Sequence, residues 1–64
     1  MYPHVEFLKK MSGKEITLYI MGNHKLGGVV VDSTADFVTL SHEDSNTKSY
    51  VATDCIVAVS FPQF

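Results

Sequence analysis

The chain has 64 residues, a net charge of −2, one cysteine and no arginine. This length allows a single domain, residues 1–64, whose small core is marginally stable without a disulfide, a metal or association. Because Cys55 has no partner and the three histidines lie far apart, we expect neither a disulfide, a metal nor a cofactor, which leaves self-association.

The sequence also lacks the features of exported and membrane-spanning chains. No apolar run approaches twenty residues, and the N-terminus has no basic start followed by an apolar core. A lone thiol is typical of a reducing compartment. We therefore expect an intracellular, cytoplasmic protein without a membrane partner.

Charge is distributed unevenly along the chain. Residues 1–28 carry four lysines and two glutamates, a net charge of +2, whereas residues 29–64 carry one lysine and five carboxylates, a net charge of −4. Since arginine is the usual bidentate donor to phosphates and base edges, its absence counts against a dedicated reader of nucleic-acid sequence. Binding through lysines and aromatic stacking stays open.

A short helix is predicted over about residues 3–11. Pro3 suits the first turn, while Lys9 and Lys10 complement the negative end of the helix dipole. Gly13 suits a left-handed cap that ends the helix. A helix of about two turns does not persist alone in water, so it must pack on the rest of the chain.

A barrel of short strands is predicted over about residues 14–61. Apolar and polar side chains alternate from residue 15 onward, and the glycine pair at 27–28 is typical of a bent strand. We expect Ile16, Leu18, Val38 and Leu40 to face the core. The strands are predicted over residues 15–21, 26–32, 37–40, 50–52 and 55–61, with a polar hairpin loop at 42–48.

This pattern indicates a mainly β fold, in which a short N-terminal helix precedes a strongly bent, five-stranded antiparallel barrel. The last strand is apolar on both faces, since Val57 and Val59 alternate with Ile56 and Ala58. We expect such a strand to lie under the helix or to meet another subunit. Pairing of edge strands between subunits into a closed ring is one solution.

The chain resembles the Sm-like superfamily, the Sm, LSm and Hfq proteins, although other SH3-like barrels share part of the pattern. The resemblance implies an Sm-like barrel that forms homo-oligomeric rings by pairing the fourth strand of one subunit with the fifth strand of the next. It rests on Phe7-Leu8 before Ile16-x-Leu18-x-Ile20, on Lys25-Leu26-x-Gly28, and on Phe37-Val38-x-Leu40.

The resemblance also implies a nucleic-acid site. Phe37 stands where Hfq has the aromatic residue of its RNA-binding pocket near the pore, and Asp36 precedes it. Ala52, Thr53 and Asp54 take the place of the Tyr-Lys-His motif of that pocket. We therefore regard Phe37, Asp36, Thr53 and Asp54 as candidate contacts, with Phe37 either stacking on a base or serving as an ordinary interface aromatic.

The lysines of the first segment form a second candidate surface. Lys9, Lys10 and Lys14 would give a basic face for nucleic acid once copied around a ring, or they are solvated lysines that complement the helix dipole. Tyr19 and Tyr50 on outward strand faces could stack on bases or pack against neighbouring strands.

Two functions from different classes follow. We favour an Sm-like homo-oligomeric ring that binds RNA or single-stranded DNA in nucleic-acid processing. The alternative is a structural or protein-interaction barrel without nucleic acid. We expect no enzymatic activity and no catalytic residues, because the neighbours Ser41 and His42 point to opposite faces of a strand.

Overall fold

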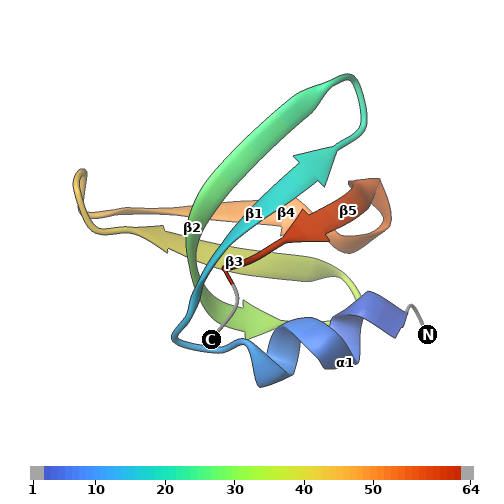
Figure 1. The fold of residues 1–64 in the computed structure, drawn as a ribbon, viewed down its shortest axis with the longest axis horizontal. Coiled ribbons are helices and arrows are strands. Elements are labelled where there is room, and N and C mark those ends of the chain that lie inside the picture. The colour runs from blue at the N-terminus through green and yellow to red at the C-terminus, as the bar shows by residue number, and fades with distance from the viewer. Residues whose placement is uncertain (1–2, 63–64) are drawn as a thin grey trace.

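The structure, a computed structural model, describes residues 3–62 as a helix followed by five strands in one antiparallel sheet (Figure 1). This confirms the predicted mainly β fold. Residues 1–2 and 63–64 of the expected domain lie outside the described residues. The elements are α1 (Pro3–Lys10), β1 (Glu15–Ile20), β2 (His24–Ser33), β3 (Phe37–His42), β4 (Thr47–Ala52), a 3-10 turn η1 (Thr53–Cys55) and β5 (Ile56–Ser60).

The sheet order is β4-β3-β2-β1-β5, so β4 and β5 are its two edges. The long β2 curves between its neighbours: its first half pairs with β1 and its second half with β3. The β2–β3 register shifts between Val30 and Asp32, and the β1–β5 register shifts between Tyr19 and Ile20. Such bulges increase twist locally and allow so small a sheet to curl.

The β3–β4 hairpin is longer than predicted. Its pairing continues to His42 opposite Thr47, so the connecting loop is residues 43–46 and not the predicted 42–48. The tight turn uses Asn46 with a positive φ of 53°. At the end of a hairpin, residues with polar side chains can continue the backbone hydrogen bonding between two strands while their side chains face water. A prediction from the spacing of apolar residues therefore misses the last residues of these strands.

The core lies between α1 and the concave side of the sheet. The expected inward residues of β1 and β3 are all buried, and Phe7 of α1 packs its ring 5.1 Å from the ring of Phe61. The Oγ of the buried Ser33 donates a hydrogen bond of 3.1 Å to the carbonyl oxygen of Val5, which fixes α1 to the end of β2. The buried apolar residues are Val5, Leu8, Met11, Ile16, Leu18, Val30, Val38, Leu40 and Val51.

Gly28 of β2 lies close against β3. A Cβ added there would lie 3.0 Å from the carbonyl oxygen of Ser41 and 3.1 Å from the Cβ of Leu40. The neighbouring Gly27 is different, because a Cβ there would make only ordinary contacts at 3.7 Å. Only one residue of the glycine pair is therefore required by the packing.

We predict that Gly28→Ala lowers the free energy of unfolding by about 1–3 kcal/mol, because β2 must move away from β3 to accept the methyl group. Gly27→Ala is the matched control, and we expect it to leave stability unchanged or slightly raised. Urea unfolding of both variants at one protein concentration measures the difference. Equal free energies of unfolding for the two variants would show that β2 and β3 can move apart at Gly28 at little energetic cost.

Candidate functional site

The segment before β3 is a tight polar turn that presents Phe37 to solvent, and this residue is 52% exposed. The Oγ1 of Thr34 accepts hydrogen bonds from the backbone N–H groups of Asp36 (3.2 Å) and Phe37 (3.0 Å). The backbone N–H of Thr34 donates to the carbonyl oxygen of Phe37 at 2.9 Å. These hydrogen bonds therefore fix the backbone from which the Phe37 side chain projects.

The turn η1 joins this segment from the other side. The backbone N–H of Thr53 donates to the carbonyl oxygen of Asp36, and its Oγ1 donates to the carbonyl oxygen of Thr34, both at 2.9 Å. The carbonyl oxygen of Thr53 accepts from the Nε2 of His4 at 3.1 Å. The structure thus joins Thr53 to the turn before Phe37, and Asp54 follows Thr53 in η1.

Thr53 nevertheless has no exposed surface, and its hydroxyl group is occupied within the fold. It links the Phe37 turn to η1, so its observed role is in the architecture. The neighbouring Asp36 and Asp54 are exposed, and both side chains are carboxylates. The surface beside Phe37 is therefore acidic.

We predict that Thr53→Val lowers the free energy of unfolding by about 1 kcal/mol, because the hydrogen bond to Thr34 is lost while the shape is kept. Asp54→Asn, at the exposed neighbouring position, should stay within about 0.5 kcal/mol of the unchanged protein. Chemical denaturation of the two variants tests this. An unchanged stability for Thr53→Val would indicate that this hydroxyl is dispensable to the fold.

The three candidate lysines lie away from the Phe37 turn. Lys9 and Lys10 are exposed in the last turn of α1, and Lys14 is exposed in the connection to β1. His4, which touches η1, is at the other end of the helix, roughly 9 Å along its axis from Lys10 at 1.5 Å per residue. The basic and aromatic candidates therefore form two separate surfaces.

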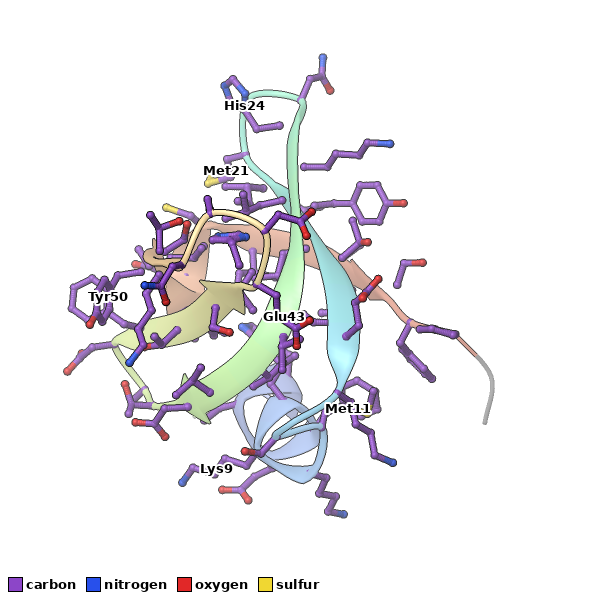
Figure 2. The ribbon with its side chains drawn as sticks, turned by 90° about the vertical axis from the view of Figure 1, so that its left-hand side faces the viewer. Lys9, Met11, Met21, His24, Glu43 and Tyr50 are labelled. Carbon is purple, nitrogen blue, oxygen red and sulfur yellow. The ribbon has the colours of Figure 1, made fainter. Side chains whose placement is uncertain are left out.

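A third surface lies at the β1–β2 hairpin, where the sequence indicated Tyr19 alone as a residue that could stack on a base. We call it the hairpin groove: a cavity of about 420 Å³. Gly22 and Asn23 make the turn with positive φ values of 85° and 61°. Met21 and His24 lie at this end of the molecule, away from Lys9 (Figure 2). The groove is lined by Tyr19, Ile20, Met21, Gly22, Asn23, His24, Lys25 and Val57.

The hairpin register explains the composition of this groove. Tyr19 pairs directly with Lys25, so an aromatic ring and an ammonium group project from the same face of adjacent strands. No carboxylate occurs among the described residues that line the groove. Outward alternation of Tyr19 was visible in the sequence, but its pairing with Lys25 depends on the length of the turn.

A second cavity, of about 250 Å³, has the opposite character. It lies between the start of β1 and the β3–β4 hairpin and includes three carboxylates, from Glu15, Glu43 and Asp44. The Nε2 of His42 lies 2.7 Å from the Oγ of Ser49 at its edge. Within residues 3–62, however, no three His, Cys, Asp or Glu side chains are placed to hold a metal ion.

Comparison with known structures identifies the class of fold. The chain matches the 1.55 Å crystal structure of the pleiotropic translational regulator Hfq with a TM-score of 0.72, over 92% of this chain and 85% of that one. Sequence identity is 15%, so the likeness concerns the fold. It confirms the Sm-like architecture that the strand pattern predicted.

The family follows from the sequence. The profile of a family described as "Domain of unknown function (DUF6897)" matches residues 4–60, and the chain belongs to this family. A comparison with curated proteins gave no match. Among the described residues, no helix is long and apolar enough to cross a membrane.

Proposed function

We propose that this chain, acting as one Sm-like domain in the cytoplasm, assembles into a homo-oligomeric ring that binds RNA or single-stranded DNA. The observation that carries the proposal is the hairpin groove, in which Tyr19 stands opposite Lys25 without a carboxylate among the described lining residues. The likeness to Hfq, a translational regulator, supports the same class of function.

The groove has the groups that an unpaired nucleotide needs. The ring of Tyr19 offers a flat face for base stacking, and the ammonium group of Lys25 offers a charge for a phosphate. His24 and Asn23 at the turn supply donors and acceptors for a base edge. This chemistry needs no arginine.

The surface around Phe37 is the second element of the proposal. Phe37 would stack on a base, while the Asp36 and Asp54 carboxylates would accept hydrogen bonds from base amino groups and repel phosphates. Thr53 contributes by holding the turn. We therefore assign this surface to base contacts and the hairpin groove to the phosphate backbone.

The helix lysines are the third element. Lys9, Lys10 and Lys14 would form a basic band around a ring, because each copy repeats the same charges. Their contribution is electrostatic and independent of sequence. The proposal includes no catalytic residue.

The sheet edges support self-association. β4 and β5 are the two edge strands of the sheet. If β4 of one copy pairs with β5 of another, the unpaired backbone N–H and C=O groups of both edges form hydrogen bonds. The β5 sequence Ile-Val-Ala-Val-Ser contains no charge and no proline to protect it. Such an edge is typical of a strand that pairs with another chain.

We predict that light scattering coupled to size exclusion gives a mass several times that of one chain, and that Val57→Lys shifts it to the monomer. Val57 is 70% exposed in a single chain, so the change costs little folding stability but places a charge on the β5 edge. Val31→Lys, on a central strand, is the matched control and should leave the assembly intact. A monomeric unchanged protein would contradict the ring.

We predict that the assembled protein binds short fluorescent oligonucleotides of uridine, adenosine and deoxythymidine in a salt-dependent manner. Tyr19→Ala should weaken binding by roughly 5- to 150-fold, the effect of losing one stacked base, whereas Tyr19→Phe should bind like the unchanged protein. Lys25→Ala should reduce the slope of affinity against salt concentration.

Parallel variants separate the three surfaces. Phe37→Ala tests the aromatic turn, and a combined Lys9, Lys10 and Lys14 to Ala variant tests the basic band. Absence of any binding at low salt by an intact assembly would contradict nucleic-acid binding and leave the protein-interaction barrel as the function.

A further inference from the structure

Two exposed aromatic residues project from the same side of the sheet. On β3, Phe37 precedes the buried Val38, and on β4, Tyr50 precedes the buried Val51, so both aromatic side chains point away from the core. Phe37 is 52% exposed and Tyr50 is 68% exposed. Figure 2 shows the ring of Tyr50 pointing away from the ribbon. Both residues therefore keep most of their surface available to a ligand.

The β3–β4 register makes these two residues neighbours. Phe37 pairs with Ala52, and Thr39 pairs with Tyr50, so Tyr50 lies on the diagonal from Phe37 across the two strands. Diagonal positions of an antiparallel pair are about 7–8 Å apart, within reach of aromatic side chains. The residues that complete this square, Ala52 and Thr39, are small. They form a low floor between the two rings.

The bulge in β2 extends this surface beyond β3. Val30 pairs with Leu40 and Asp32 pairs with Thr39, so Val31 is the extra residue of the bulge. Val31 is 43% exposed beside Thr39 and adds an aliphatic side chain. We call this surface the outer face, and its residues are Val31, Asp32, Phe37, Thr39, Tyr50 and Ala52.

Lys48 places a positive charge at one end of the outer face. It is exposed two residues before Tyr50, so it projects from the same side of β4. Alternate residues of a strand are about 7 Å apart along its axis. The ammonium group of Lys48 can therefore reach a phosphate that is next to a base stacked on Tyr50.

The carboxylates near the outer face lie away from this phosphate position. Asp32 is separated from Tyr50 by β3, which is roughly 10 Å at the usual spacing of strands. Asp36 is exposed at the opposite end, directly before β3. Glu43 and Asp44, in the hairpin turn, line the acidic cavity next to β1. A strand of nucleic acid along β4 would therefore keep its phosphates on the Lys48 side.

We infer that the outer face is a stacking platform for two consecutive bases of an unpaired strand, one on Phe37 and the next on Tyr50. Aromatic side chains exposed on neighbouring strands of a sheet can stack successive bases of a single strand. Lys48 binds the phosphate beside the base on Tyr50. This inference rests on the proposed function and extends it, because it adds a second base position to the Phe37 surface within one chain.

The platform is compatible with assembly through the sheet edges. A strand that joins the free side of β4 would bind the backbone N–H and C=O groups, which lie in the plane of the sheet. The side chains of a strand stand roughly perpendicular to that plane. The outer face therefore stays open to a ligand in an assembly, and it needs no residue from a second copy.

The platform is tested by titrating a uridine dinucleotide into the protein and following the NMR signals of individual aromatic rings. The signals of Phe37 and Tyr50 should shift with one common midpoint concentration. Tyr50→Leu keeps an apolar side chain and should raise the midpoint at Phe37 by about tenfold or more, the effect of losing one stacked base. Tyr50→Phe keeps the ring and should leave that midpoint unchanged. Tyr19, in the hairpin groove, is the internal control, and its midpoint should be the same in all three proteins.

Dinucleotides that lack one base locate the two positions in the unchanged protein. Removal of one base should abolish the shift at Tyr50 and keep a shift at Phe37, and removal of the other base should do the reverse. Tyr50→Leu should weaken binding of the first of these ligands no further, because the base that it would contact is already absent. A merely structural role of Tyr50 would weaken all the ligands equally and would overturn the platform.

The salt dependence of binding tests the phosphate contact. Lys48→Ala should reduce the slope of log affinity against log salt concentration by about 0.7 at the Phe37 signal, which corresponds to one phosphate of a single strand. Lys25→Ala is the matched control, since it should change the slope at the Tyr19 signal and not at Phe37. An unchanged slope at Phe37 in Lys48→Ala would overturn the role of Lys48.

Failure of the platform is distinguishable from failure of the proposed function. If Phe37 or Tyr19 responds to the dinucleotide and Tyr50→Leu leaves the Phe37 midpoint unchanged, the platform is overturned while nucleic-acid binding stands. If no ring responds at low salt to the dinucleotide or to longer oligonucleotides, the proposed function fails and the platform fails with it. The outer face would then be left to a protein partner.

Discussion

The close contact between β2 and β3 at Gly28 is the constraint on which the rest of the structure depends. β2 serves two partners, β1 along its first half and β3 along its second, and it must curve between them. The curvature is possible because Gly28 brings backbone against backbone where a methyl group would meet Ser41 and Leu40. That bend separates the β1–β2 hairpin, with its groove, from the end of β2, where Ser33 binds the carbonyl oxygen of Val5.

Local pattern was sufficient to predict the fold class, because the buried positions of β1 and β3 alternate with positions that are not buried. Ile16, Leu18, Val38 and Leu40 were expected inside and are buried. The polar end of the β3–β4 hairpin was underestimated, since its pairing to Thr47 rests on backbone hydrogen bonds that leave no hydropathy signal. The hairpin groove could not be predicted, because it depends on a register that opposes Tyr19 to Lys25 and on a bulge that sets Val57 at its rim.

The residues near Phe37 show what a family resemblance can predict about position and what it cannot predict about the role of a side chain. Thr53 donates hydrogen bonds to the carbonyl oxygens of Asp36 and Thr34, which joins η1 to the turn before Phe37. Thr53 is fully buried, so the side chain of a residue that the resemblance implied as a ligand contact connects two loops. The helix lysines do not join this cluster, since the end of α1 that reaches it carries His4.

A chain of 64 residues buries a smaller fraction of its surface on folding than a larger domain does, so pairing of its edge strands would add stability. Nine apolar residues form the buried core of residues 3–62, while Val57 and Tyr50 remain largely in water. In a small barrel these two features are linked, because the core is too small to bury every apolar side chain. Val57 and Tyr50, the most exposed large apolar residues among those described, lie on the edge strands, which have no neighbour on one side. If β4 and β5 pair between copies, assembly would bury the apolar area that a single chain leaves in water, and the stability of the fold would then rise with protein concentration by mass action.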